Sequence, residues 1–382
     1  MVFKRLLLLL PLLALGGCAT LDDFLASLKK GKDSGAVAFE ERPVEDPIAP
    51  NSFVLTQADQ SVVGEPQVVF TRKEDTLSDL AREYGLGYDE ILAANPGTDP
   101  WLPGENTPIM LPTQYVLPNV PKSGVVLNIA TKRLFYYPEA TDGEPQQVLT
   151  YPIGIGRVGW ETPLGATKVV SKARDPSWWV PASVRREHSE MGNPLPSVVP
   201  PGPDNPLGTR VLKLEMPGYL IHGTNQPYGV GMRVSHGCVR LYPENIEFLY
   251  TLVGIGESVM IVNEPYQMGQ RDGVLYFEAH TPLKDDAVPA EARLQALFEE
   301  HVDAAGRPLN DHLRSHVRSL ADEASGMPVS IVMYDANEFV ARARVVHNTV
   351  EMDPDAPTLL EVREMMDEVA AEVAAEIEEE SM

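Results

Sequence analysis

The 382-residue chain contains only two cysteines, Cys18 and Cys238, which excludes a disulfide-rich scaffold. Positive charge is scarce as well: 31 lysines and arginines stand against 55 aspartates and glutamates, for a formal net charge of −24. A surface of that sign repels nucleic acid and anionic lipid, so we expect no nucleic-acid partner. What the chain does have is 43% hydrophobic residues, enough for real cores, and its length predicts two or three domains.

Long apolar runs are rare, and the clearest one covers residues 6–15, directly after two basic residues. This pattern predicts a secretory signal peptide over 1–18, because the run is too short for a mature membrane-spanning helix. Residues 15–18 resemble a bacterial lipobox, which implies that Cys18 is acylated; an ordinary signal peptide with a chance cysteine is the alternative. Because Ala19 is not aspartate, we expect a periplasmic protein that this lipid anchors to the outer membrane.

Lipidation of Cys18 would leave Cys238 without a disulfide partner. A lone thiol in an oxidising compartment is a liability unless it has a function. Cys238 lies in the segment Ser235-His236-Gly237-Cys238-Val239-Arg240, and a second short segment upstream reads Ile221-His222-Gly223-Thr224. A thiol becomes a strong nucleophile when a neighbouring imidazole takes its proton. The two segments therefore predict a cysteine acyl-transfer centre with Cys238 as the nucleophile.

Residues 19–113 divide into a linker and a compact unit. Residues 19–67 lack periodicity and are rich in Asp, Glu, Pro and Ser, which predicts a flexible linker, with some strand after residue 61. A small α+β domain is expected over 68–113. Its predicted elements are a strand at 68–70, a helix at 75–84 capped by Asp75 and stopped by Gly85, a helix at 88–94 and a strand at 108–112.

Residues 122–264 carry a different pattern of short strands at close spacing. Apolar or alternating runs lie at 125–129, 133–137, 148–153, 165–172, 210–215, 219–222 and 258–262. The clearest helix is at 243–250, and the proline-rich stretch 197–206 is interpreted as a long loop beside the site. The pattern predicts a mostly β catalytic domain, an antiparallel sandwich or barrel.

Residues 265–382 form an acidic C-terminal extension that we predict to be largely helical. Amphipathic patterns predict helices at 291–303 and 311–324, and a buried strand follows at 329–334. Thr358 and Glu361 fit a capping box at the start of a last helix. Its apolar stripe consists of Leu359, Val362, Met366, Val369, Val373 and Ile377. Packing on the body of the protein is the default role for this stripe, and a partner helix is the alternative.

Two family resemblances rest on these motifs. The unit at 70–112 is similar to a LysM module, the small peptidoglycan-binding fold, through Asp75-Thr76-Leu77, Tyr84-Gly85, Ala94-Asn95-Pro96 and Leu102-Pro103-Gly104. An inert spacer domain is the alternative. The wider region 70–283 resembles the YkuD-type L,D-transpeptidases, in particular the periplasmic subgroup that joins murein lipoprotein to peptidoglycan. The matching motifs are Gly154–Arg157, Thr162–Gly165, His222–Thr224, Gly229, Gly231 and Ser235–Leu241.

The resemblance implies a role for each residue of the site. Cys238 attacks an amide carbonyl, and His222 is the general acid and base, oriented by a backbone carbonyl near Gly223. Backbone N–H groups of the turn at His236, Gly237 and Cys238 are candidates for stabilising the oxyanion. Ser235 shapes the turn. Arg240 either binds a substrate carboxylate or fixes the loop, and the sequence does not choose between them.

A zinc site is the competing interpretation of the same residues. His222, His236 and Cys238 are all possible zinc ligands. A His-x-Cys spacing within a glycine turn is poor for converging side chains, and the sequence offers no fourth ligand. We therefore expect no metal and no cofactor.

The reaction that the resemblance implies is amide exchange in the cell wall. The donor is a peptidoglycan tetrapeptide stem, cleaved after its third residue with release of D-alanine. The acceptor is a lysine of an abundant lipoprotein, the amine of another stem, or water, in that order of preference; the last would make the enzyme an L,D-carboxypeptidase. A non-catalytic wall-binding lipoprotein, in which the LysM-like unit binds glycan, is the alternative from a different class.

Overall fold

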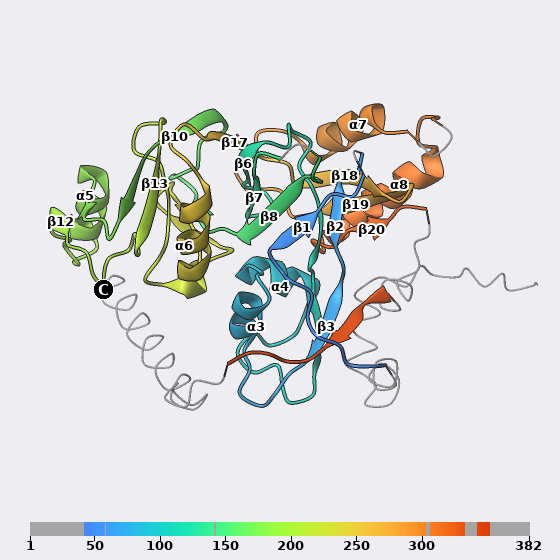
Figure 1. The fold of residues 1–382 in the computed structure, drawn as a ribbon, viewed down its shortest axis with the longest axis horizontal. Coiled ribbons are helices and arrows are strands. Elements are labelled where there is room, and N and C mark those ends of the chain that lie inside the picture. The colour runs from blue at the N-terminus through green and yellow to red at the C-terminus, as the bar shows by residue number, and fades with distance from the viewer. Residues whose placement is uncertain (1–41, 58, 141–142, 303–305, 333–341, 352–382) are drawn as a thin grey trace, which may run out of the picture.

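The fold is taken from a computed structural model (Figure 1), which describes residues 42–57, 59–140, 143–302, 306–332 and 342–351. Cys18 and the predicted helix beginning at Thr358 lie outside the described residues. Within the described residues, no helix combines the length and the apolar character that crossing a membrane requires.

The largest element is a nine-stranded sheet, with strand order β1-β8-β7-β6-β17-β10-β13-β14-β16. In that order the strands are β1 (Ser52–Val54), β8 (Gln147–Pro152), β7 (Arg133–Tyr137), β6 (Gly124–Asn128), β17 (Ser258–Val262), β10 (Gly165–Arg174), β13 (Arg210–Leu214), β14 (Leu220–His222) and β16 (Val239–Arg240). Neighbours are antiparallel except for the pairs β6–β17 and β14–β16. The mostly β prediction is confirmed.

Both faces of this sheet are buried. Val125 and Leu127 of β6 belong to one apolar cluster, which includes Ile246 of helix α6 (Pro243–Leu252), whereas Val126 between them belongs to a second cluster on the opposite face. Successive strand residues point to opposite sides, so an uninterrupted apolar run is what a sheet covered on both faces requires.

Smaller elements surround the sheet edge that carries β14 and β16. β9 (Ile155–Gly156) pairs in parallel with β15 (Arg233–Ser235), and β11 (Trp178–Trp179) pairs with β12 (Val198–Val199). Helix α5 (Ala182–Glu190) lies between β11 and β12 in sequence, and the 3₁₀ turn η1 (Pro227–Gly229) precedes β15. Within the proline-rich stretch 197–206, only the two residues of β12 form strand.

The LysM-like unit has the predicted order of strand, helix, helix and strand: β3 (Gln67–Phe70), α3 (Leu77–Glu83), α4 (Tyr88–Ala94) and β4 (Pro108–Leu111). The predicted cap of the first helix is wrong by one residue. Thr76 is the N-cap and forms a capping box with Asp79, while the carboxylate of Asp75 accepts hydrogen bonds from the Arg72 backbone and from Asn348. Asp75 is thus occupied by a partner from the far end of the chain.

The prediction of a flexible linker up to residue 67 is wrong for its described part. β1 forms one edge of the nine-stranded sheet, and β2 (Val62–Gly64) pairs with β5 (Gln114–Val116). Leu55, Val62 and Val63 are all buried in these contacts. The apolar surface that they bury stabilises strands in a segment whose composition alone favours disorder.

The described part of the C-terminal extension is mixed α/β rather than largely helical. The two predicted helices are present as α7 (Ala290–Glu300) and α8 (Asp311–Glu323), but they pack on a three-stranded sheet of β18 (Tyr266–Arg271), β19 (Val274–Ala279) and β20 (Val329–Ser330). Asp272 and Gly273 both have positive φ, which is the geometry of an Asp-Gly hairpin turn. That turn is the sequence signal for the missed hairpin.

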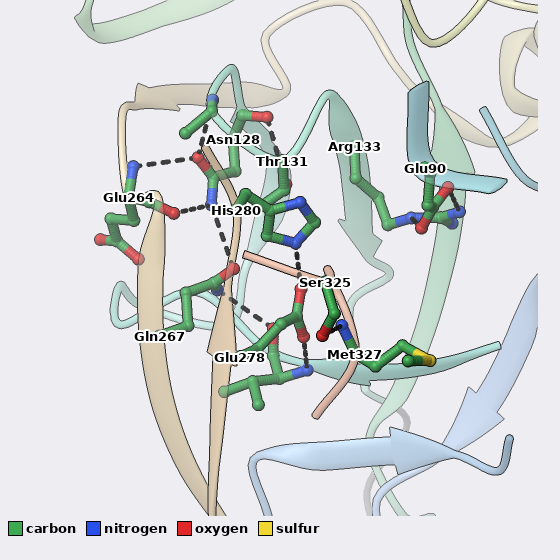
Figure 2. A network of polar contacts seen from close by, with 12 residues as sticks. Glu90, Asn128, Thr131, Arg133, Glu264, Gln267, Glu278, His280, Ser325 and Met327 are labelled. Carbon is green, nitrogen blue, oxygen red and sulfur yellow. Dashed lines mark hydrogen bonds and ion pairs between the residues drawn. The ribbon is translucent and has the colours of Figure 1, made fainter. Parts of the chain in front are cut away.

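A buried polar network joins this extension to the rest of the molecule (Figure 2). Glu278 accepts hydrogen bonds from the backbone N–H of Val116 at 2.6 Å and pairs with His280 at 2.7 Å. Gln267 donates to the carbonyl of Val116 at 3.0 Å, and Asn128 donates to the carbonyl of Glu264 at 2.9 Å. Beyond this network, β21 (Arg344–Val346) adds in parallel to β3, so the extension also completes the sheet of the LysM-like unit.

Candidate active site

The two motif segments lie side by side as the parallel strands β14 and β16. Ile221 is in register with Val239, and His222 is in register with Arg240. Cys238 directly precedes β16, two residues before Arg240. Residues two apart along an extended chain face the same side, so this register directs Cys238, Arg240 and His222 to one face of the sheet. Burial lowers the pKa of His222 and raises that of Cys238, and the positive charge of Arg240 acts on both toward a lower pKa, which fits that arrangement.

His222 is buried as a neutral imidazole. Burial, helped by the nearby charge of Arg240, lowers its pKa to about 3. Its Nδ1 lies 2.6 Å from the carbonyl oxygen of Gly223. A carbonyl can only accept, so Nδ1 carries the proton of the neutral ring and Nε2 keeps its lone pair. The geometry therefore presents a base that is not itself protonated at neutral pH.

Cys238 is a half-buried free cysteine. Burial raises the pKa of its thiol, against the opposing effects of the Leu220 backbone and of Arg240. The sulfur lies 3.8 Å from the carbonyl oxygen of Gly218, an acceptor for the thiol proton. The resting thiol is thus protonated at neutral pH, and it needs a base in order to react.

The turn before Cys238 is fixed by hydroxyl groups. The Ser235 hydroxyl donates to the carbonyl of Cys238 at 2.5 Å and accepts from the N–H of Gly237 at 3.2 Å, while Thr162 donates to the Gly237 carbonyl at 3.0 Å. Gly237 has φ +99°, and a Cβ there would lie 3.0 Å from the Tyr219 ring, so only glycine fits. Among the described residues, the backbone N–H of Cys238 has no hydrogen-bond partner.

The side chain of His236 belongs to a cluster on the other side of the turn. Its Nε2 lies 2.7 Å from Glu187 of α5 and 3.2 Å from Arg157, which forms an ion pair with the same carboxylate. Trp160 packs edge-on against the ring with centroids 4.8 Å apart. The cluster anchors α5 to the turn. Sequence reasoning missed Glu187, since a helix about fifty residues upstream gives no local signal that it meets His236.

Arg240 projects an unpaired guanidinium into this site. Within the described part of the chain its side chain makes no hydrogen bond or ion pair, and its buried Nε has no partner. Burial lowers the pKa of this arginine, which is the expected effect when a charge loses water without gaining a counter-ion. An arginine in this condition is well suited to a planar anion such as a carboxylate.

The three possible zinc ligands do not converge. No group of three or more His, Cys, Asp or Glu side chains in the described ranges is arranged to hold a metal ion. Nε2 of His236 instead lies 2.7 Å from the carboxylate of Glu187.

Comparisons with known proteins identify two modules in this chain. Residues 122–261 match the family model of the L,D-transpeptidase catalytic domain (YkuD), and residues 71–100 match the LysM domain. The chain is 37% identical over 295 residues to the probable L,D-transpeptidase YcfS of Escherichia coli K12, covering 75% of this chain and 89% of YcfS. It is 39% identical over 291 residues to YbiS of the same strain, covering 73% of this chain and 92% of YbiS.

A third relative, the probable L,D-transpeptidase ErfK/SrfK of Salmonella typhimurium, is 35% identical over 291 residues, covering 73% of this chain and 91% of that protein. The chain belongs to the L,D-transpeptidase family: it is a peptidoglycan L,D-transpeptidase that carries a LysM domain. The comparisons set aside the alternative of a non-catalytic wall-binding protein.

Proposed function

We propose that Cys238 is the nucleophile of this L,D-transpeptidase and that His222 is its general acid and base. The Cys238 sulfur attacks the carbonyl of the third residue of a tetrapeptide stem, and Nε2 of His222 takes the thiol proton. When the amide C–N bond breaks, His222 returns the proton to the leaving amine of D-alanine, and a thioester remains. The incoming amine attacks the thioester and gives its proton to His222. The C–S bond then breaks, and His222 returns the proton to the sulfur, which restores the thiol.

One observation carries the assignment. A neutral imidazole with a free Nε2 lies on β14, and a protonated thiol directly precedes the neighbouring β16, in a register that turns both side chains to one face. A pair of neutral groups fits this chemistry, because the thiolate forms only when the imidazole takes the thiol proton during the attack.

The backbone N–H of Cys238 is the donor that we assign to the oxyanion. It is unpartnered among the described residues, whereas the N–H of Gly237 is occupied by Ser235. A single such donor is typically worth about 3 kcal/mol in the transition state. His236, Gly237 and Ser235 then act by holding the turn that aims this N–H.

We assign Arg240 to a carboxylate of the stem peptide. The sequence left open whether this arginine binds substrate or fixes the loop. Its guanidinium has no internal partner within the described ranges, which favours substrate binding. A bound carboxylate would supply the missing counter-ion beside Cys238.

The neutral thiol–imidazole pair predicts a distinctive pH dependence. His222, with a pKa near 3, stays in its base form at every higher pH, so protonation of this base costs activity only as the pH falls toward 3. The raised pKa of Cys238 means that the thiolate accumulates only above its usual range near 9. We expect the rate of Cys238 acylation by a carbapenem to be flat between about pH 5 and pH 8 and to rise at higher pH. The acylation rate is measured at each pH by mass spectrometry of samples quenched at timed intervals. An inflection of the rate near pH 6.5 would contradict a neutral, buried His222.

We further propose that acylated Cys18 holds the enzyme at the periplasmic face of the outer membrane, with the LysM module on glycan. The support is the basic start, the short apolar run and the lipobox-like ending in the sequence, together with the LysM match. In this place the enzyme would serve cell wall biogenesis and cell shape.

The acceptor is proposed to be a lysine of an abundant murein-linked lipoprotein, ahead of a second stem or water. All three outcomes share the same thioester and differ only in the group that enters afterwards. We expect muramidase digests of walls from cells that express this chain to contain stems joined to a lysine-bearing peptide, identified by mass spectrometry. Digests that contain only stem–stem crosslinks, or only shortened stems, would assign transfer to a second stem or hydrolysis instead.

A further inference from the structure

A short turn of the LysM domain contacts the residues that flank the catalytic segment 233–241 on each side. Residues 85–88 lie between α3 and α4 and include the first residue of α4; the two helices lie beside the catalytic domain (Figure 1). On the upstream side, the N–H of Tyr88 donates to the carbonyl of Val230 at 3.1 Å. On the downstream side, the hydroxyl of Tyr242 donates to the carbonyl of Leu86 at 3.1 Å. The segment with His236, Gly237 and Cys238 is therefore held between two contacts with one turn.

At the centre of this interface, two glycine backbones touch. A Cβ placed on Gly87 would lie 2.7 Å from Cα of Gly231, and a Cβ on Gly231 would lie 2.4 Å from Cα of Gly87. Gly231 also has φ +87°, which other residues rarely adopt, whereas Gly87 has φ −90° and ψ 158°, which alanine accepts. A side chain at 87 therefore clashes with the backbone of Gly231, two residues before the catalytic segment.

A buried ion pair organises the same turn (Figure 2). Glu90 of α4 accepts a hydrogen bond from the N–H of Gly87 at 2.9 Å and pairs with Arg133 of β7 at 2.7 Å. Arg133 in turn donates to the carbonyl of Gly85 at 3.0 Å, and its guanidinium lies 4.1 Å from the centre of the Tyr115 ring. Both charged side chains are almost fully buried, so removing one partner leaves the other uncompensated.

We propose that the LysM domain is a structural part of the active site, in which Gly87 and Glu90 are positioning residues for Cys238. The strands that hold the catalytic turn, β15 and β16, are only three and two residues long, so their placement depends on what supports their ends. The turn 85–88 supplies that support from a neighbouring domain. The role differs from glycan binding, and it rests on the proposed function in one respect, that Cys238 is the acylated thiol.

The test is Gly87→Ala in the full-length chain, purified in detergent. We measure the acylation of Cys238 by a carbapenem, a probe too small to need a glycan contact, and the alkylation of the same thiol by iodoacetamide. A displacement of about 1 Å between reacting groups typically costs on the order of a hundredfold in rate. We expect acylation at neutral pH to fall by about that factor. Alkylation, measured at an alkaline pH where the thiolate of Cys238 forms without a base, should stay within about threefold. The Gly87→Ala protein should still sediment with purified walls to the same extent as the unsubstituted chain.

The matched control is Gly254→Ala, a second glycine-to-alanine change in the catalytic domain. A Cβ on the exposed Gly254 would meet no atom within 4 Å, and its φ is not positive, so alanine fits there without strain. Its acylation rate should therefore change by less than about fivefold. If Gly87→Ala does not fold, as judged by circular dichroism, the shape-conserving Glu90→Gln carries the same comparison.

The outcomes separate this inference from the proposed function. A folded Gly87→Ala or Glu90→Gln protein that is acylated as fast as the unsubstituted chain overturns the positioning role. An unsubstituted chain that forms no adduct on Cys238 refutes the nucleophile assignment instead. Equal losses of acylation and alkylation would indicate a buried or damaged thiol rather than a misplaced one, and would also overturn the inference.

Discussion

Cys238→Ser is expected to abolish both carbapenem adduct formation and transpeptidation, with residual activity below about a thousandth of the unsubstituted enzyme. Serine keeps the volume of the side chain and its place before β16, but its hydroxyl is a much weaker acid and nucleophile than a thiol. Cys238 is the free cysteine of the described residues, so no other thiol there can take over the reaction. Intact-mass spectrometry of the full-length chain with and without carbapenem measures the adduct.

A loss of activity in Cys238→Ser is informative only if the rest of the protein is intact. Its circular dichroism spectrum and its sedimentation with purified walls should match those of the unsubstituted chain, because the substitution changes one atom of a half-buried side chain. An adduct of unchanged yield on Cys238→Ser, mapped to another residue, would contradict the assignment of the nucleophile.

The second large effect is expected for His222→Asn. The asparagine amide can still donate to the carbonyl of Gly223, but it cannot accept the thiol proton. Removing a general base typically costs a factor of about 10² to 10⁴, and we expect a loss in that range for acylation at neutral pH. The rate should partly recover at alkaline pH, because the thiolate then forms without help once the pH passes the raised pKa of Cys238.

His312→Asn is the matched control for this substitution. His312 is exposed on α8, in the C-terminal extension, and takes no part in the site. Acylation by the control should equal that of the unsubstituted chain across the pH range. If His222→Asn reacts within tenfold of the unsubstituted enzyme at neutral pH, His222 is not the base, and another group must take the proton.

Much of the fold was predictable where the signals are local. The helix at 88–94 and the strands flanking the LysM domain follow from caps, stops and apolar periodicity within a few residues, and α4 has the predicted bounds. The mostly β catalytic domain follows from closely spaced apolar runs. By contrast, β1 and β21 were missed, since each is a three-residue strand that is stabilised only by a distant partner.

The candidate site divides in the same way. The segments around His222 and Cys238 contain the reactive groups and the glycine that their turn requires, and both are legible in the sequence. The contact of Glu187 with His236 could not be predicted from the sequence, and neither could the hydrogen bond that Thr162 donates to the turn. Nor do residue types show which backbone N–H groups are already hydrogen-bonded. In the structure the N–H of Gly237 is bonded to Ser235, and this leaves the N–H of Cys238 as the candidate donor.

By itself the sequence determined the chemistry available to this protein: a lone thiol, an imidazole, and two recognisable modules in order along the chain. Only the tertiary structure decided which face the thiol and imidazole share, that Arg240 lacks an internal partner among the described residues, and that a LysM turn supports the catalytic segment. The physical reason is the separation along the chain between the residues that interact. Motifs and caps depend on neighbours within one turn or strand, whereas the pair of Glu90 and Arg133 joins residues 43 positions apart, through burial that no local pattern encodes.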